Sequence, residues 1–321
     1  MKEKNLISEE TQQNLIFSLK GVGPITFEKL NLAGYTTIKD IAAATPRMLS
    51  SKCDFSEKYS QNLIAEAKKF TPSHFFEKAS EILKRKKLST RLTLGNKQMD
   101  DFLQGGIETQ AITEFFGESA TGKTQICFQI AAFLANKGGL GENLILYIDS
   151  ENTFKPERVE EICIENNLDV EKVLNKILVI RAFNSSDQIL VFDYLEKFEH
   201  KTKIKLIIID SITTHFRSEF IGRGYLSERQ QLLNSHLKDL MRFSIKTDSA
   251  IVLTNQVLSN PDTFGMPLKP AGGNILAHSS TIRIFLKKAF GGKKLAKIFS
   301  APHLEEKELL FKISKQGVSS L

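Results

Sequence analysis

A glycine-rich octapeptide has the residue types and the spacing of a phosphate-binding loop. It runs from Gly117 to Thr124 and reads GESATGKT, a glycine followed by four residues and Gly-Lys-Thr. Glycines let backbone N–H groups wrap around phosphate oxygens, the lysine neutralises the terminal phosphates, and the next hydroxyl binds Mg²⁺. The pattern predicts a site for ATP and Mg²⁺. The residues expected to bind the nucleotide are Gly117, Glu118, Ser119, Ala120, Thr121, Gly122, Lys123, Thr124 and Gln125.

Two carboxylates follow apolar segments that could carry them to this loop. Asp210 ends the apolar run 206–210, and Glu151 comes two residues after the run 144–149. At the carboxyl ends of parallel strands, Asp210 can hold Mg²⁺ together with Thr124, and Glu151 can orient the water that attacks the γ-phosphate. The spacing leaves a second interpretation of Glu151 open, as the cap of a helix that begins near residue 156.

The elements that would position these residues can be read from the alternation of apolar runs with longer helical stretches beyond residue 91. The expected strands are 112–116, 144–149, 177–181, 206–210 and 250–255, and the expected helices lie near 124–135, 156–166, 186–199 and 226–245. This alternation predicts an α/β fold with a mostly parallel central sheet covered on both faces. Three shorter runs, 281–286, 295–299 and 309–313, predict an antiparallel extension.

The first part of the chain has a different pattern, of short helices joined by turns. Thr45 and Ser56 have the character of helix caps, and the first is followed by a proline at the first helical position. A break at Phe-Thr-Pro-Ser follows residue 69. We therefore predict a small all-α domain over residues 1–70, a linker over 71–90 and an ATPase core over 91–321.

Composition and charge narrow the class of protein further. The net charge of +7 and the sequence pI of about 9.1 favour an anionic partner such as nucleic acid. No apolar run reaches the ~20 residues of a membrane span, and the polar N-terminus does not read as a signal peptide, which predicts a soluble intracellular protein. The three cysteines have no paired or metal-binding spacing, so reduced thiols are expected.

Several longer segments resemble the RecA/RadA recombinase family, archaeal RadA in particular, in their order and spacing. They are GGIETQAITEFFGESATGKTQ, YIDSENTFKPERV, RAFNSSDQIL, IIIDSITTHFRSEFIGRGYLSERQQLLNSHL, LTNQV and ILAHSSTIRIFLKK. The resemblance covers about residues 11–316. Its archaeal type implies a cytoplasmic location, whereas a eukaryotic host would imply the nucleus. It implies a RecA-like P-loop ATPase core and a DNA-dependent ATPase that forms filaments on single-stranded DNA and pairs it with double-stranded DNA.

The resemblance also implies roles for individual residues. Glu151 would position the water, and with Lys123 and Gln256 it would form the catalytic set. Arg158 would lie against the adenine, and Gln256 would sense the γ-phosphate. His278 would reach the nucleotide that a neighbouring subunit binds. Without the resemblance, Gln256 reads as a polar strand end and His278 as a core residue.

Two polar, glycine-containing stretches resemble the family's DNA-binding loops. The first, at about 215–229, carries arginines that can grip phosphates, and the second, at about 258–274, ends in paired glycines. Phe264, in the second loop, could meet a base or pack locally. The residues expected to contact DNA here are Arg217, Arg223, Arg229, Gly272 and Gly273.

Two features outside the core complete the resemblance. Gly21 and Gly23, between short helices, resemble a helix-hairpin-helix whose N–H groups contact duplex phosphates, although a tight turn also needs glycine. In the linker, Phe76 and Ala79 match a Phe-x-x-Ala polymerisation motif. Such a motif would join protomers head to tail, as a helical filament or a ring.

The chain departs from the family at three places. Ser119-Ala120-Thr121 replaces Phe-Gly-Ser in the P-loop, where bonding through the backbone should tolerate the change. Asn274 replaces a histidine after the paired glycines. Ser300 and Ala301 replace Asp-Ser, which should alter the cap over ATP.

Three other functions remain open at this point. A recombinase paralogue could act as a mediator with weak ATPase activity, a helicase-like motor could use a related core, and a structural protein could coat DNA with a vestigial site. The intact P-loop and both carboxylates argue against the last of these.

Overall fold

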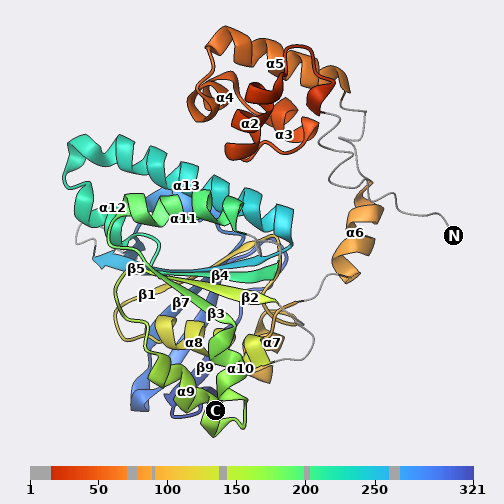
Figure 1. Ribbon diagram of the computed structural model, residues 1–321. Coiled ribbons are helices and arrows are strands. Elements are labelled where there is room, and N and C mark those ends of the chain that lie inside the picture. Colours follow the sequence, from red (N-terminus) through yellow and green to blue (C-terminus); the bar gives the residue numbers. More distant parts are fainter. Residues whose placement is uncertain (1–15, 71–77, 89–90, 137–142, 199–202, 260–267) are drawn as a thin grey trace, which may run out of the picture. The chain divides into compact units, whose positions relative to one another are not determined.

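The computed structural model describes residues 16–70, 78–88, 91–136, 143–198, 203–259 and 268–321. The chain forms two compact units, residues 1–88 and 89–321 (Figure 1). Within the described ranges, no helix is both long and apolar enough to cross a membrane.

The first unit is helical, with its own apolar core around Ile16, Leu30, Leu49 and Leu63, all of them buried. Its helices are α2 (Pro24–Leu32), α3 (Ile38–Ala43), α4 (Pro46–Cys53), α5 (Glu57–Phe70) and α6 (Ala79–Leu88). Helix α6 falls within the segment predicted as a linker, where the sequence reading had placed no helix. Apart from Lys78, the other residues predicted for the linker lie outside the described ranges.

Side-chain caps define the starts of these short helices. Thr45 Oγ1 accepts a hydrogen bond from Met48 N at 3.2 Å, and Ser56 Oγ accepts one from Tyr59 N at 3.2 Å. Each cap satisfies an N–H group that the first helical turn leaves without a partner. Both caps were predicted from the sequence and are confirmed.

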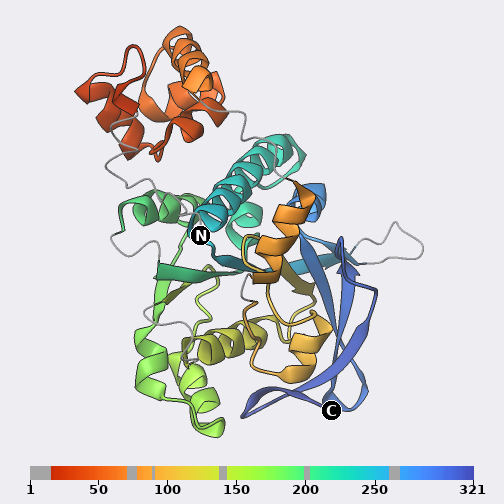
Figure 2. The same ribbon diagram turned by 90° about the vertical axis from the view of Figure 1, so that its right-hand side faces the viewer.

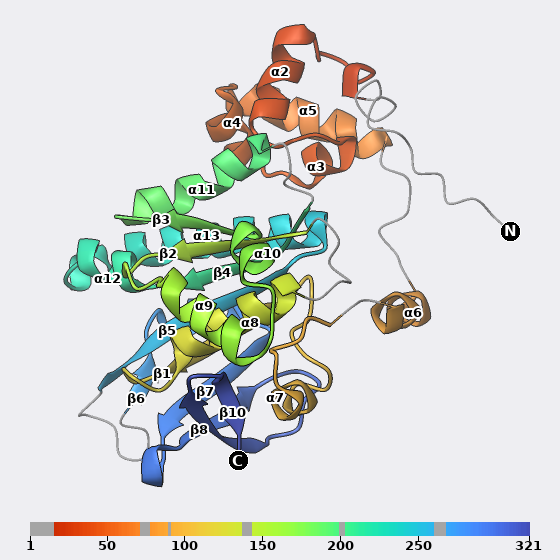
Figure 3. The same ribbon diagram turned by 60° about the horizontal axis from the view of Figure 1, so that its bottom comes forward.

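The second unit contains a central sheet with helices on either side. Its strands are β1 (Ile112–Gly117), β2 (Leu144–Asp149), β3 (Ile177–Arg181), β4 (Ile204–Asp210), β5 (Ala250–Ser259), β6 (Leu268–Pro270), β7 (Ile282–Lys288), β8 (Lys294–Ser300), β9 (Glu308–Ser314) and β10 (Gly317–Ser320). The strand order is β10-β9-β8-β7-β1-β5-β4-β2-β3, and β6 pairs with β5. Figure 3 shows β3 and β10 at opposite ends of the sheet.

The sheet is parallel from β7 to β3 and antiparallel from β7 to β10. The predicted mixed α/β fold, its parallel core and its antiparallel extension are therefore confirmed. Buried strands of this kind are nearly all apolar because helices cover both of their faces. The four-residue strand β10 was not predicted, because its sequence, Gly-Val-Ser-Ser, carries no strand pattern.

Helices lie on both faces of the sheet (Figures 1 and 2). They are α7 (Lys97–Phe102), α8 (Lys123–Asn136), α9 (Pro156–Glu165), α10 (Val170–Asn175), α11 (Ser185–Lys197), α12 (Thr214–Glu219), α13 (Leu226–Thr247) and α14 (Gly273–Ser279). Helices α8, α9 and α10 bury their apolar side chains in one core, and α11, α12 and α13 bury theirs in a second core on the opposite face.

One loop expectation is wrong. The stretch 215–229 was expected to be a loop, but it holds most of α12, a short 3₁₀ helix η3 (Arg223–Tyr225) and the start of α13. His215 and Phe216 are buried, and the ring Nε2 of His215 lies 2.7 Å from the carbonyl oxygen of Ala182. The buried Phe216 ring and the contact between His215 and Ala182 therefore hold this stretch as a packed helical segment rather than a loop.

Strand register gathers the functional residues at one edge of the sheet. Gly117 at the end of β1 pairs with Gln256 of β5, and Asp149 at the end of β2 pairs with Asp210 of β4. In a parallel sheet, loops that follow the carboxyl ends of neighbouring strands form the crevice where ligands bind.

Candidate functional site

The P-loop joins β1 to α8, and its glycines are required by close packing. A Cβ atom added at Gly117 would lie 2.1 Å from the carbonyl oxygen of Leu286. Gly122 has a φ of +106°, and a Cβ atom there would lie 2.9 Å from Ile313 Cδ1. Contact with the backbone excludes a side chain at Gly117, and the positive φ disfavours one at Gly122.

Lys123, the first residue of α8, turns its ammonium group back onto the loop. Its Nζ donates hydrogen bonds to the carbonyl oxygens of Gly117 at 2.9 Å and of Glu118 at 2.7 Å. Burial lowers the pKa of the Lys123 ammonium, whereas the negative charges of Asp210 and Glu151 oppose that shift. An anion in the loop would stabilise the charged form, as expected of a phosphate-binding lysine.

Asp210 lies buried at the end of β4, where three hydroxyl groups surround its carboxylate. Tyr147 donates to Oδ2 at 2.9 Å, Thr254 donates to Oδ1, and Thr124 is also a hydrogen-bond partner. Burial raises the pKa of the Asp210 carboxyl, and these hydrogen bonds oppose the shift. A carboxylate beside the Thr124 hydroxyl provides the hard oxygen ligands that Mg²⁺ prefers, so the donor set fits that ion.

Glu151 is exposed to the cavity, and one of its oxygens collects three hydrogen bonds. Its Oε1 accepts from Ser211 Oγ at 2.9 Å, from Thr214 Oγ1 at 2.7 Å and from Gln256 Nε2 at 3.1 Å. The alternative interpretation of Glu151 as a helix cap is wrong, because Lys155 holds the N-cap position of α9.

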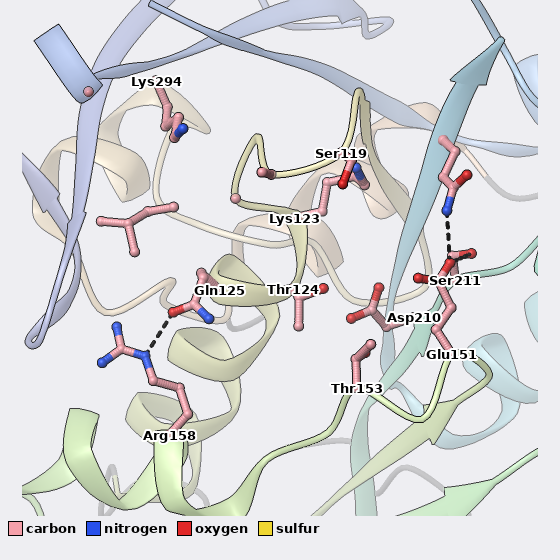
Figure 4. Close-up of a pocket in the computed structure, with 15 residues that line it drawn as sticks. Ser119, Lys123, Thr124, Gln125, Glu151, Thr153, Arg158, Asp210, Ser211 and Lys294 are labelled. Atoms are coloured by element: carbon pink, nitrogen blue, oxygen red, sulfur yellow. Dashed lines mark hydrogen bonds between the residues drawn. The ribbon is translucent and has the colours of Figure 1, made fainter.

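These residues surround one cavity of about 700 Å³, here called the P-loop cavity (Figure 4). The predicted residues that line it are Ser119, Ala120, Gly122, Lys123, Thr124, Gln125, Glu151, Arg158, Asp210 and Gln256. Sequence reasoning missed five others, which are Thr153, Ser211, Gly292, Lys294 and Ile313. The run Gly-Gly-Lys-Lys, which ends at residue 294, was the sequence feature that could have indicated a phosphate contact for Lys294. Figure 4 shows Lys294 across the cavity from Asp210.

Arg158 lines the P-loop cavity, but several protein atoms hold its guanidinium group. Its Nε donates to Gln125 Oε1 at 2.8 Å (Figure 4), and its two terminal nitrogens donate to the carbonyl oxygens of Lys315 and Ser314. Arg158 also pairs with Glu161. The expected contact with adenine remains a prediction, and in this structure Arg158 ties α9 to the turn after β9.

Gln256 lies within β5, and its amide connects two other groups. In addition to its bond to Glu151, its Oε1 accepts a hydrogen bond from Nη1 of Arg217 at 3.3 Å. Arg217 is half-buried on α12. The structure thus brings Arg217, predicted to contact DNA, to the edge of the nucleotide site.

The second predicted loop is partly ordered by β6 and α14, while 260–267, including Phe264, lie outside the described ranges. Gly272 has a φ of +83°, a backbone conformation that favours glycine, and a Cβ atom there would lie 2.4 Å from Leu276 Cδ1. A Cβ atom at Gly273 would meet nothing within 4 Å. His278 and Asn274 are exposed on α14, so the interpretation of His278 as a core residue is wrong.

The remaining predicted residues are not among those that line the P-loop cavity. Gly21, with a φ of +97°, accepts a hydrogen bond at its carbonyl oxygen from Tyr59 Oη at 2.6 Å, and Gly23 precedes α2. Arg223 lies in η3, and Arg229 is half-buried on α13. Ala79 is exposed at the start of α6, whereas Phe76 lies outside the described residues. Their predicted roles stay predictions.

All three cysteines are free and buried. Burial raises the pKa of Cys53 and of Cys163 to about 11 and that of Cys127 well above its usual value. Cys127 lies in the apolar core of the second unit, and thiols whose pKa is raised in this way are poor nucleophiles.

Comparison with protein families agrees with the α/β fold and the P-loop cavity described above. The family described as Rad51 matches residues 84–321, a range that includes the whole central sheet and every residue around the P-loop cavity. The phosphate loop, the buried Asp210 and the exposed Glu151 all fall within that match. The chain therefore belongs to the Rad51 family of RecA-like recombinases.

Proposed function

We propose that this chain is a DNA-dependent ATPase that assembles on single-stranded DNA and promotes homologous pairing and strand exchange, as archaeal RadA does. The observation that carries the proposal is the convergence of Lys123, Asp210, Glu151 and Gln256 on one cavity. A site for binding nucleotide alone would need the loop and its lysine. The exposed carboxylate with its bonded amide is the arrangement that hydrolysis requires in addition.

Each group around the cavity has a distinct task in hydrolysis. The P-loop N–H groups and Lys123 hold the β- and γ-phosphates, and Thr124 with Asp210 would hold Mg²⁺, which neutralises phosphate charge when bound. Glu151 orients the attacking water and accepts its proton. Ser211, Thr214 and Gln256 fix the direction in which the Glu151 carboxylate faces.

Assembly and DNA binding rest on the family membership and on the residues matched to it. A net charge of +7 suits a partner whose phosphates are held without reading bases. Phe76 and Ala79 would join protomers head to tail, with His278 reaching the neighbour's nucleotide. Gly21 and Gly23 would contact duplex DNA. The region 1–70 would then be the DNA-binding helix-hairpin-helix domain and 71–90 the polymerising linker.

A joint-molecule assay tests the proposal directly. Purified protein is incubated with a circular single strand and a homologous duplex, with and without ATP, beside the Lys123→Ala variant. We expect joint molecules with wild-type protein and ATP, and none without ATP or with the variant. ATP-dependent DNA binding without joint molecules would instead favour a mediator paralogue, and processive strand separation would favour a helicase-like motor.

A further inference from the structure

Lys294 occupies a strand position that faces the apolar core. Side chains along a strand alternate between its two faces, so Lys294 of β8 shares a face with Ala296 and Ile298. Both of these side chains are buried in the core that α8 also enters. Lys294 continues their row at the end of β8, where the core meets the P-loop cavity, and it lines that cavity. A lysine is therefore present where the alternation would supply an apolar side chain.

The neighbouring strand shows what this face of β8 looks onto. Lys294 pairs with Phe311 of β9, and residues directly opposite each other in an antiparallel pair project from the same face. Phe311 packs beneath the phosphate loop, because a Cβ atom added at Gly122 would lie 3.4 Å from its ring. Ile313, two residues further along β9, is on the same face and lines the cavity. The Lys294 side chain thus projects toward the phosphate loop.

The Lys294 ammonium group has no counter-charge in the described part of the chain. Among those residues it forms no hydrogen bond and no ion pair, although the side chain is half-buried. By contrast, Lys297 on the other face of the same strand pairs with Glu306 at 3.3 Å. A half-buried ammonium without a partner costs free energy, and an anionic ligand in the cavity would recover that cost.

The place of Lys294 in the cavity selects the part of a nucleotide that it can reach. Lys123, Asp210 and Glu151 mark the end where the γ-phosphate and Mg²⁺ would lie. Figure 4 shows Lys294 across the cavity from Asp210. The P-loop N–H groups between them cradle the middle of the phosphate chain. On the side of Lys294, the anionic group that a nucleotide offers is its α-phosphate.

We propose that Lys294 is a nucleotide-binding residue whose ammonium group donates to an α-phosphate oxygen and so holds ATP and ADP alike. The inference rests on the proposed ATPase and adds to its site a residue from the antiparallel extension of the sheet. A lysine acts on phosphate as a compact point charge and needs no fixed fork geometry. Because the α-phosphate is not transferred, this contact strengthens the binding of substrate and product equally.

Calorimetric titration of the full-length protein tests the assignment. ADP and the non-hydrolysable analogue AMP-PNP are each titrated with Mg²⁺ into wild-type protein, Lys294→Met, Lys294→Arg and Lys312→Met. Methionine keeps the length of the stem without the charge, and arginine keeps the charge. Lys312 is the matched control, because it is exposed on the adjacent strand β9 and projects from the face opposite to Phe311. Thermal unfolding of each variant shows whether the fold is retained.

We expect Lys294→Met to bind both nucleotides about tenfold more weakly, which is the effect of losing one hydrogen bond to a charged group. The factor should be the same for ADP and for AMP-PNP, because both contain the α-phosphate. Lys294→Arg should recover most of the affinity. Lys312→Met should bind both nucleotides as wild-type protein does.

Three results would overturn the inference. They are unchanged affinity in a folded Lys294→Met, a loss for AMP-PNP alone, which would place the ammonium at the γ-phosphate, and an equal loss in Lys312→Met, which would be an effect of overall charge. If Lys294→Met does not fold, Lys294→Gln takes its place under the same criteria. Wild-type protein that binds neither nucleotide would refute the proposed ATPase, and the role of Lys294 with it. Wild-type binding with any of the three results refutes the role of Lys294 alone.

Discussion

Tyr147 Oη donates a hydrogen bond to Asp210 Oδ2 at 2.9 Å, and neither side chain is exposed. The two residues lie on adjacent strands, β2 and β4. The bond helps to keep Asp210 ionised against the burial that raises its pKa. A tyrosine that reads as one more core aromatic in the sequence is therefore part of the predicted metal site.

The Tyr147→Phe substitution should weaken the use of Mg²⁺ without unfolding the core. The ring still packs against Phe128 and Phe154, but Asp210 loses a donor and its pKa rises further. We expect the Mg²⁺ concentration for half-maximal ATP hydrolysis to rise about tenfold, from the loss of one hydrogen bond to a charged group. Tyr194→Phe, at an exposed position of α11, is the control, and an equal Mg²⁺ requirement in both variants would contradict the assignment.

The Glu151→Gln substitution should abolish turnover while nucleotide binding survives. An amide cannot take up the proton of the attacking water, so kcat should fall by about 10²- to 10⁴-fold, the usual contribution of a positioned base. The P-loop contacts do not involve Glu151, so ATP affinity measured by titration calorimetry should change little. Glu157→Gln, exposed on α9, should behave as wild type. Comparable losses of ATP affinity and of rate would instead assign Glu151 to binding.

The buried ion pair between Glu114 and Arg283 should be costly to break. Glu114 Oε2 lies 2.6 Å from Arg283 Nε, and the side chains are 0% and 6% exposed. Glu114→Gln leaves the guanidinium buried without a counter-charge, so we expect a loss of about 3 kcal/mol in the free energy of unfolding. Urea denaturation measures this loss in the Glu114→Gln variant. The double variant Glu114→Leu/Arg283→Met is measured in the same way.

Two comparisons make this prediction specific. The double variant should be more stable than Glu114→Gln alone, because no buried charge is left uncompensated. Glu306→Gln, which removes the partner of Lys297 in a pair whose glutamate is 77% exposed, should cost less than about 1 kcal/mol. Equal costs for Glu114→Gln and Glu306→Gln would rule out the proposed role of burial.

His236 should make stability depend on pH. Complete burial lowers its pKa from 6.5 to about 3 in the folded chain. Between these values the unfolded chain binds a proton that the folded chain does not, so stability falls as the pH falls, by up to about 1.4 kcal/mol per unit. Denaturation at several pH values should give a flatter dependence for His236→Gln. His278→Gln, at an exposed position, should keep the wild-type slope.

Much of the fold and part of the site could be predicted because their signals are local. The apolar runs of β1 to β5, the P-loop spacing and the cap at Thr45 each depend on neighbouring residues. Lys294 and the hydroxyl of Tyr147 enter the site through strand pairing across long stretches of chain, which no short pattern records. The error over 215–229 has a related cause, since glycine and arginine suggested a loop where tertiary packing formed α12.

The wall of the P-loop cavity near Gly122 and Arg158 is built by β9 and the turn after it, through Ile313, Ser314 and Lys315. During synthesis these residues leave the ribosome some 190 positions after the loop that they enclose. The growing chain must therefore fold the loop, α8 and most of the sheet without an enclosed pocket. A nucleotide that meets the growing chain before that point can contact the phosphate loop, but not this wall.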